Sequence, residues 1–590
     1  MLSINERVSQ LRDKMKANNF KAYCITGTDA HQSEYVAPYF FTRAFISGFT
    51  GSAGYVIVTL EEAILWVDSR YYIQAKEEIK GSEFIMKKID STEDEKPFEY
   101  LKNRLAAKDK VAVDMDTISI ASYKAEKAGL KDIEFVLCND LLQDFWCDRQ
   151  PKPTSKIRSV KLEHSGLEAS DKLNKIRQVL TANKADYTFI SALDDIAWIT
   201  NLRGSDVEFN PVYTAFLLIS LDQAILFTQK ERFSEEILKI AEQDFTISPY
   251  ESALEVLANF KDKVALYNDK KVSATFISLL DNGRNIVADD PSTLMKAKKN
   301  PIELMGMRKA HFDDAVSYVN FLAKLDINPN GQFNEINISD KLEDERKRVP
   351  TYIGPSFAPI SGFKANGAMC HYKADEATCK VLDAPGLLVL DTGSQFPCGT
   401  TDITRTIYFG DQATEEEKRD YTLVLKGHLA LSAQRFIEGT RGYQLDVLAK
   451  QFMWNYGLSF FHGTGHGIGC NLNVHEGPMN ISNKPIDVAL EEGMIVSNEP
   501  GIYKEGRHGI RIENLIVVTK DIKTEMGQFY TFETLTLVPY ENKLIDLSLL
   551  TDTELDMINN YHKWVYEELV DHVDDNAKIY LKEACKRLER

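Results

Sequence analysis

The sequence has few cysteines and no long apolar run. Its eight cysteines are spread over 590 residues without a C-x-x-C pair, which excludes a zinc finger and favours free thiols over a disulfide framework. No apolar run approaches the roughly 18 residues of a membrane-spanning helix. The N-terminus lacks an apolar signal core, and Glu6 and Asp13 argue against a mitochondrial presequence. We therefore expect a cytoplasmic protein with no membrane partner.

Basic residues are outnumbered by acidic residues. There are 70 Lys and Arg residues against 88 Asp and Glu residues, which gives a formal net charge of −18. A nucleic-acid-binding protein needs a concentrated basic face, so we expect no nucleic-acid partner. The composition, 44% hydrophobic and 27% charged, is that of an ordinary folded protein. A chain of this length is too long to fold around one hydrophobic core, so we expect two to four domains.

The first half of the chain reads as two α/β domains. Short apolar strands alternate with helical stretches, and the segment 149–157 has two prolines and no apolar periodicity, as in a linker. Residues 58–66 resemble residues 219–227, and both predict strand, acidic turn, strand. We interpret this echo as two related domains, at 1–155 and 156–300. Two unrelated hairpins are the alternative.

A third domain is predicted from residue 301 onward. Pro301 can occupy a helix start, and a long helical pattern follows it. Beyond it we expect a mixed α/β (α+β) domain over 301–590, which ends in a charged helical extension from Thr551.

Histidines concentrate in this third domain. Six of the chain's 11 histidines fall between residues 371 and 508. Residues 461–467 read Phe-His-Gly-Thr-Gly-His-Gly, and His475 follows nine residues after His466. The glycines would let the backbone approach a ligand closely. Two other histidines are expected to be structural, His428 as a packing or surface residue of a helix and His508 as a loop residue.

Acidic residues stand at strand ends around these histidines. Residues 386–391 form an apolar strand that ends in Asp391, and Asp402 begins the next alternating segment, so an adjacent strand pair could bring both together. A lone aspartate at a strand end is more often a turn or cap residue. Glu499 ends a further apolar strand at a Pro-Gly turn.

Glu513 is predicted to lie inside a strand over 509–518, on the same face as Arg511. A buried glutamate is costly unless it is paired or bound to metal, and an Arg511–Glu513 ion pair is the structural alternative. Together, four carboxylates and one or more imidazoles suit two divalent ions. Such oxygen-rich ligation favours manganese, cobalt or zinc.

This joint set of motifs resembles the metallopeptidase family with the pita-bread fold, which includes methionine aminopeptidase, prolidase and aminopeptidase P. Segments 28–35, 66–72 and 201–211 are similar to the N-terminal and middle domains of the large, three-domain aminopeptidase P. Prolidase and methionine aminopeptidase lack that two-domain preface. The resemblance therefore implies two α/β domains followed by a pita-bread catalytic domain.

The resemblance also implies roles for particular residues. The metal ligands would be Asp391, Asp402, His466, Glu499 and Glu513. They would hold two divalent ions, expected to be Mn²⁺, with Co²⁺ or Zn²⁺ as alternatives. The catalytic residues would be His371, His462, His475 and Glu499. The substrate-binding residues would be Arg70, His371, His466 and His475. Tyr372 and Phe363 are candidate walls of the pocket for the proline ring.

The expected reaction is hydrolysis of the first peptide bond of peptides whose second residue is proline, by a hydroxide that bridges the two ions. Glu499 would carry the proton and His475 would stabilise the oxyanion. A homodimer is expected by analogy, with Trp454 near the subunit contact. A prolidase-like Xaa-Pro dipeptidase is the close alternative. A metal-free scaffold protein of the same fold is a more distant one.

Overall fold

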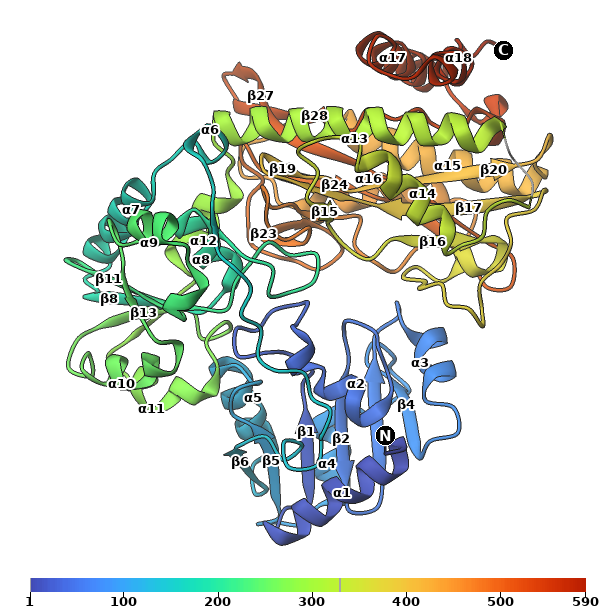
Figure 1. The fold of residues 1–590 in the computed structure, drawn as a ribbon. Coiled ribbons are helices and arrows are strands. Elements are labelled where there is room, and N and C mark those ends of the chain that lie inside the picture. The colour runs from blue at the N-terminus through green and yellow to red at the C-terminus, as the bar shows by residue number, and fades with distance from the viewer. Residues whose placement is uncertain (1, 328–330) are drawn as a thin grey trace. The chain divides into compact units, whose positions relative to one another are not determined.

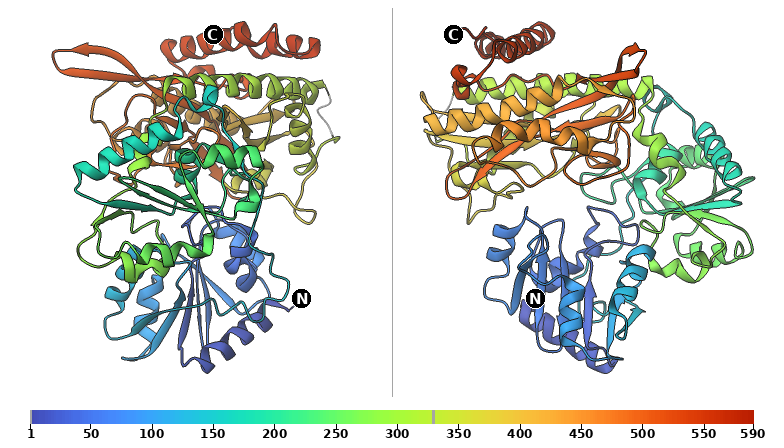
Figure 2. Two further views of the ribbon diagram at one scale, coloured as in Figure 1. Left: turned by 60° about the vertical axis from the view of Figure 1, so that its left-hand side comes forward. Right: turned by 180° about the vertical axis from the view of Figure 1, so that it is seen from behind.

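Two units make up the described chain, which comprises residues 2–327 and 331–590 of a computed structural model. The first unit contains Met1–Lys161 and Leu167–Thr293, and the second contains Leu162–Gly166 and Leu294–Arg590. Figures 1 and 2 show their elements as ribbons coloured along the chain. The contacts group the first two expected domains into one unit, so the boundaries at 155 and 300 stay predictions.

The first unit holds two six-stranded sheets of the same design. Their strand orders are β4-β3-β2-β1-β5-β6 and β12-β11-β10-β8-β13-β14. In both, three consecutive strands, β3-β2-β1 in the first sheet and β11-β10-β8 in the second, pair antiparallel, and the strands on either side of them join in parallel. The similar segments 58–66 and 219–227 lie in the matching hairpins, β2–β3 and β10–β11. This shared topology confirms two related α/β halves.

The strands of these sheets have the following bounds: β1 Ala22–Ile25, β2 Tyr55–Thr59, β3 Ala63–Val67, β4 Phe84–Lys88, β5 Lys110–Asp114, β6 Glu134–Cys138, β8 Tyr187–Ile190, β10 Phe216–Ser220, β11 Ala224–Phe227, β12 Thr246–Ser248, β13 Ala265–Tyr267 and β14 Ile286–Val287. The main helices of this unit are α1 Ile4–Ala17, α4 Pro97–Arg104, α5 Ile120–Leu130, α7 Ala169–Ala182 and α8 Leu193–Thr200. Helix α1 buries the predicted apolar stripe of Val8, Leu11 and Met15.

The second unit is built on helix α13 (Pro301–Ile327), which begins at the proline that the sequence predicts as a helix start. Helix α18 (Asp575–Ala584) packs on α13, and α17 (Asp552–Leu569) packs on both. Figure 1 shows α17 and α18 beside α13 on the side away from the sheets, as do the views in Figure 2. The expected helical extension from Thr551 is therefore present, with Thr551 as the N-cap of α17.

Two sheets of this unit position the four predicted carboxylate ligands, which lie in or next to their strands. One has the order β16-β17-β20 and the other β21-β28-β27-β24-β22-β23. Helices α15 (Glu415–Ser432) and α16 (Gly442–Trp454) pack against each other beside them. The strands are β16 Ile360–Phe363, β17 Gly386–Thr392, β20 Ile403–Phe409, β21 Phe436–Ile437, β22 Gly465–Gly467, β23 Glu476–Ile481, β24 Ile495–Asn498, β27 Asn514–Thr524 and β28 Gly527–Thr534.

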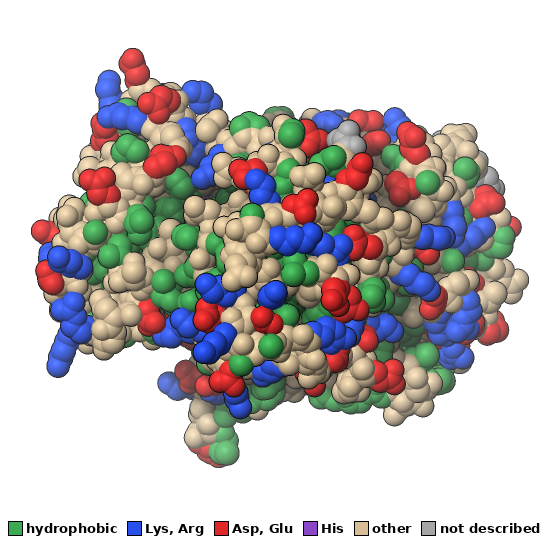
Figure 3. Space-filling model, turned by 90° about the horizontal axis from the view of Figure 1, so that it is seen from below, with side chains coloured by type: hydrophobic (Ala, Val, Ile, Leu, Met, Phe, Trp, Pro, Cys, Tyr) green, Lys and Arg blue, Asp and Glu red, His purple; other side chains and the backbone are tan. Residues whose placement is uncertain are grey.

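Charged side chains of both signs are interspersed over the face drawn in Figure 3, without one continuous basic area. Within the described part of the chain, none of the helices combines the length and the apolar character that a membrane crossing requires.

Candidate metal centre

The first pair of carboxylates comes from two neighbouring strands. Strands β17 and β20 pair antiparallel, with Asp391 opposite Thr404 and Thr392 opposite Ile403. Asp402 immediately precedes β20, so both aspartates lie at the same end of this strand pair. Both are buried, at 8% and 4% exposure. The sequence predicts both strands, because the apolar run of β17 leads up to Asp391 and the alternating segment of β20 begins after Asp402.

The second pair comes from the other sheet in the same manner. Strands β24 and β27 pair antiparallel, with Asn498 opposite Asn514 at their ends. Glu499 follows β24 and Glu513 precedes β27, so each glutamate extends from one of two paired strands. The two sheets are joined at this point, since the Glu513 amide donates to the Thr404 carbonyl at 3.1 Å and the Thr404 hydroxyl donates to Glu513 Oε2 at 2.8 Å.

The continuous strand predicted over 509–518 is wrong. The chain forms β26 (His508–Arg511), which pairs with β25 (Gly501–Lys504), and then enters β27 in a different sheet. Glu513 lies at the break between the two strands. Apolar residues lie on both sides of the break, so apolar periodicity does not mark it. His508 consequently belongs to a strand and not to the expected loop, where its Nε2 lies 3.1 Å from Asp420.

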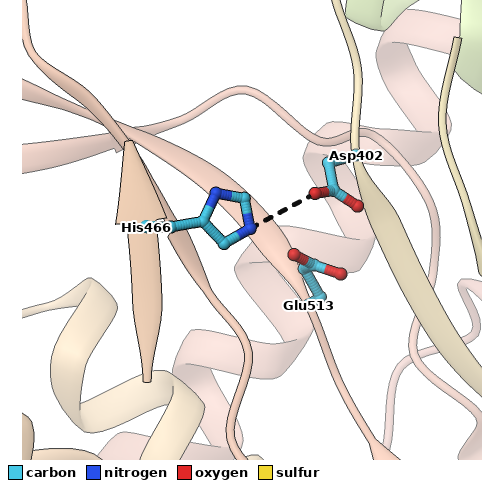
Figure 4. Close-up of side chains that lie close together, drawn as sticks. All are labelled: Asp402, His466 and Glu513. Atoms are coloured by element: carbon cyan, nitrogen blue, oxygen red, sulfur yellow. Dashed lines mark ion pairs between the residues drawn. The ribbon is translucent and has the colours of Figure 1, made fainter. Parts of the chain in front are cut away.

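His466 completes the cluster from strand β22. Asp402, His466 and Glu513 present ligand atoms that all lie within 4.8 Å of one another (Figure 4). His466 Nε2 is 3.5 Å from Asp402 Oδ2 and 3.5 Å from Glu499 Oε1. Its Nδ1 is 3.0 Å from the Gly467 carbonyl, to which it can donate. This hydrogen bond leaves the Nε2 lone pair directed to the acidic cluster, as in a metal-binding histidine.

The sheet requires the glycines on both sides of His466. A Cβ atom on Gly465 would lie 1.8 Å from the Ser497 carbonyl oxygen, and one on Gly467 would lie 2.1 Å from that of Glu476. Real Cβ atoms never approach so closely, so these positions require glycine for the contact between β22 and its neighbours. The sequence-based interpretation, that these glycines provide room for a ligand, stays a prediction.

Burial and mutual repulsion raise the pKa values of Asp402, Glu499 and Glu513. The pKa of Asp402 is well above its usual range because the group is buried and because Asp391 and Glu499 lie nearby. Burial, then the charges of Asp402, Glu499 and Asp391, raises the pKa of Glu513 in the same way. The pKa of Glu499 rises to about 7, mainly through burial. Without bound metal ions, the folded protein reduces the repulsion among these buried carboxylates by binding protons.

The donor set fits divalent metal ions. Asp391 Oδ1 is buried and has no hydrogen-bond partner among the described residues. Its other oxygen, Oδ2, accepts from Arg511 Nη2 at 2.6 Å. Oxygen ligands with one imidazole suit manganese, cobalt or zinc. Arg511 therefore pairs with Asp391 and not with Glu513, the partner that the sequence suggested as a structural alternative.

Tyr503 and Thr404 are functional candidates that the sequence did not reveal. The Tyr503 hydroxyl lies 2.9 Å from His462 Nε2 and 2.7 Å from Arg511 Nη1. Arg511 Nε donates to the Thr404 hydroxyl at 3.1 Å. These bonds join His462 to the acidic cluster through neutral and cationic groups. No local motif identifies Tyr503, because its role depends on contacts between separate strands.

The remaining predicted histidines lie at different distances from the cluster. The ring of His475 is 4.3 Å from that of His466, centroid to centroid. His462 Nδ1 lies 4.0 Å from Glu499 Oε2. His371 is half-buried in a turn between β16 and β17, next to Cys370, whose carbonyl accepts from Arg511 Nη1 at 3.3 Å.

Three expectations about other residues can be compared with the structure. Phe363 is fully buried in the core that includes Phe409, so it is not a pocket wall. The Tyr372 hydroxyl donates to Glu335 at 2.9 Å and is buried. Arg70 belongs to the first unit, where it forms a two-pronged pair with Asp68. Its substrate role stays a prediction.

A pH experiment follows from the raised pKa of Glu499. In the metal-free chain the folded state holds this proton up to about pH 7, whereas the unfolded state releases it near the ordinary value of 4.5. The unfolded state therefore binds fewer protons across this window, and the free energy of unfolding falls as the pH rises through it. Asp402 and Glu513 shift in the same direction. Urea unfolding at several pH values measures the slope.

The metal-loaded chain is expected to lack this slope, because the ions compensate the carboxylate charges. Equal slopes with and without Mn²⁺ would mean that these carboxylates do not share a metal site.

Known proteins resemble the chain along its whole length. The family model described as metallopeptidase family M24 matches residues 306–520, and one described as the C-terminal region of peptidase M24 matches 528–588. Two models described as creatinase/prolidase N-terminal domain match 7–145 and 148–303. "Xaa-Pro aminopeptidase 1" of Dictyostelium discoideum is 36% identical and covers 100% of this chain and 97% of its own length.

Further relatives agree with this assignment. "Aminopeptidase P2" of Arabidopsis thaliana is 36% identical over 96% of this chain and 86% of its own length. Among solved structures, an X-prolyl aminopeptidase from Caenorhabditis elegans, described as "a cytosolic enzyme with a di-nuclear active site", superposes with a TM-score of 0.95 at 30% identity and covers all of both chains. The chain therefore belongs to metallopeptidase family M24, together with Xaa-Pro aminopeptidases that share its full length.

Proposed function

We propose that this protein is a metal-dependent exopeptidase that hydrolyses the N-terminal Xaa–Pro bond of peptides. The observation that carries the proposal is the convergence of two paired-strand ends, which bear Asp391 with Asp402 and Glu499 with Glu513, on His466. Full-length similarity to Xaa-Pro aminopeptidases supplies the substrate class. The three-domain division at 1–155, 156–300 and 301–590 remains part of this proposal.

Two divalent ions would be held by the five side chains of the candidate centre: Asp391, Asp402, His466, Glu499 and Glu513. When bound, such ions lower the pKa of a coordinated water from 15.7 to about 7 and so supply a nucleophile at neutral pH. Manganese is the proposed metal, and cobalt and zinc suit the same donor set. The dinuclear centre described for the Caenorhabditis elegans enzyme supports two ions.

Glu499 is the proposed proton carrier. Its carboxylate extends into the candidate centre, where Glu499 Oε1 is 3.5 Å from His466 Nε2, so it would be within reach of a water held there. The Ser497 hydroxyl donates to Glu499 Oε1 at 3.2 Å, which fixes the orientation of the group. Glu499 would deliver the proton to the departing proline nitrogen, a step typically worth about 10²–10⁴-fold in rate.

Three histidines are the proposed substrate contacts. His475 lies against His466 and would donate to the carbonyl oxygen as negative charge develops on it, which is worth about 3 kcal/mol per donor. His462 is oriented by Tyr503, and His371 would complete the positioning of the scissile bond. Arg70 of the first unit is the proposed contact for the remainder of the peptide. A cytosolic location is proposed from the description of the Caenorhabditis elegans enzyme.

A substrate panel separates the aminopeptidase from a prolidase-like dipeptidase. The account predicts that the Mn²⁺-loaded protein cleaves Xaa-Pro-Xaa peptides and longer Xaa-Pro peptides, and that Xaa-Ala-Xaa peptides are poor substrates. If only Xaa-Pro dipeptides were cleaved, the dipeptidase alternative would replace the present proposal.

We further propose a homodimer whose contact includes the outer face of α16. Tyr443, Val447 and Trp454 on this helix are 40%, 43% and 52% exposed, and Phe461, next to His462, is 85% exposed. Clustered exposed apolar side chains commonly mark a protein interface.

Trp454→Glu is expected to convert the protein to monomers, because it places a charge in the apolar contact. Sedimentation velocity measures the change, with Met526→Glu, at a residue 73% exposed between β27 and β28, as the matched control. A wild-type protein that is already monomeric, or a dimer that survives Trp454→Glu, would contradict the proposed contact.

A further inference from the structure

Arg405 is a buried cation that joins the backbones of the two sheets bearing the metal centre. It lies on β20 and is 2% exposed. Its Nη1 donates to the Glu513 carbonyl at 2.7 Å and to the Thr404 carbonyl at 2.9 Å. One guanidinium nitrogen therefore holds together the strand that follows Asp402 and the segment that carries Glu513.

The other guanidinium nitrogens bond to Asn514, beside Glu513, and to the segment that follows β28. Nε donates to the Pro539 carbonyl at 3.1 Å, and Nη2 lies 2.7 Å from the Val538 carbonyl. Nη2 also lies 3.2 Å from the hydroxyl of Tyr561, a residue of the C-terminal helix α17. That hydroxyl is itself 2.9 Å from the Val538 carbonyl. Helix α17 thus contacts Arg405 through the Tyr561 hydroxyl.

No described carboxylate forms an ion pair with Arg405, which is unusual for a buried guanidinium. Its hydrogen bonds instead end on fixed carbonyl, amide and hydroxyl oxygens. The planar fork of arginine can satisfy such an array only when the acceptors keep their relative positions. The same array therefore constrains the backbones that provide the acceptors.

The groups around Arg405 are neutral and closely packed. Tyr540 stacks on Tyr561 with ring centroids 4.6 Å apart, and its amide donates to His562 Nε2 at 3.1 Å. The pKa values of His562 and His428 fall to about 3 through burial and, second, the charge of Arg405. Both imidazoles are thus uncharged at neutral pH, as an acceptor role for His562 requires. Arg405 supplies the positive charge of this cluster.

We propose that Arg405 is a positioning residue for the metal centre and that helix α17 supports it through the Tyr561 hydroxyl. Arg405 contacts no proposed ligand side chain; it sets the separation of the backbones that carry Asp402 and Glu513. The C-terminal extension is accordingly part of the support for the metal site. This inference rests on the proposed function only in requiring that the centre binds divalent metal.

The test is the affinity of the metal-stripped full-length protein for Mn²⁺, measured by isothermal titration calorimetry. Arg405→Lys keeps the charge and loses the fork, and is expected to weaken binding by up to about 100-fold. Tyr561→Phe removes only the hydroxyl and is expected to weaken it by about ten-fold. Tyr566→Phe is the matched control, because Tyr566 lies on the same helix, packs on the core and is not a partner of Arg405.

Titrations are made at a temperature at which thermal unfolding shows every metal-free variant to be folded. Weaker Mn²⁺ binding in Tyr561→Phe than in Tyr566→Phe supports the proposal, even if Arg405→Lys does not fold. Equal affinities in these two tyrosine variants overturn it, whatever their melting temperatures. A wild-type protein that binds Mn²⁺ without cleaving Xaa-Pro peptides would refute the proposed function and leave this inference standing.

Discussion

Glu499→Gln is expected to lower kcat/KM on an Xaa-Pro-Xaa peptide by about 10²–10⁴-fold, toward the upper end of that range. Glutamine cannot accept and release the proton that we assign to the Glu499 carboxylate. It also removes one charge from the proposed metal ligands. Glu505→Gln, the same change at an exposed residue of the turn between β25 and β26, is the matched control. Stopped assays of N-terminal residue release measure both variants.

The loss should appear in kcat more than in KM, because the proton transfer belongs to the transition state. Manganese content should be measured on the same samples. A Glu499→Gln protein that keeps its metal and loses activity supports the proton-carrier role. Activity within about two-fold of wild type would refute both roles that we assign to this residue.

Removal of metal is expected to abolish activity, and addition of Mn²⁺ is expected to restore it. Bound divalent ions would supply a coordinated water as the nucleophile at neutral pH. Metal should also stabilise the fold, by about 2.7 kcal/mol at a free concentration of about 100 times Kd. Activity and melting temperature are measured before chelation, after it and after reconstitution.

Parallel reconstitution with Co²⁺ and Zn²⁺ tests the proposed preference for manganese. Full activity in the chelated, metal-free protein would contradict the account. Fewer than one ion per chain under metal-replete conditions would instead favour the alternative of a metal-free scaffold.

The sequence predicted which residues gather in the candidate centre better than it predicted the strands around them. Asp391, Asp402 and Glu499 were placed at strand ends, because each follows or precedes an apolar run that stops abruptly. Glu513 was placed inside a strand, although it lies where the chain passes from one sheet to another. Residues 509–518 are apolar on both sides of this passage, so periodicity alone cannot locate it.

The hydrogen bonds around the candidate centre could not be predicted from the sequence. Tyr503, Thr404 and Arg405 act through contacts with segments about 40 to 160 residues away, and no local motif fixes such distances. The need of the sheet for the glycines of the histidine motif was missed for a related reason. Their neighbours are the carbonyls of strands paired only in the folded sheet, so their requirement for glycine becomes visible only there.

The two N-terminal domains were recognised from a short repeat, and the matching strand orders show why it survives in the sequence. Each copy, 58–66 and 219–227, forms a central hairpin of its sheet, where apolar residues are needed on both faces. Arg70 was identified by resemblance alone. Its pairing with Asp68 gives no sign of a substrate role.

The most direct test of the central claim is the identity of the products formed from one peptide. The Mn²⁺-loaded protein is incubated with a peptide that begins Xaa-Pro-Xaa, and the products are determined by mass spectrometry. The account predicts release of the single N-terminal residue, which leaves a peptide that begins with proline. An intact peptide, or cleavage at any other bond, would contradict it.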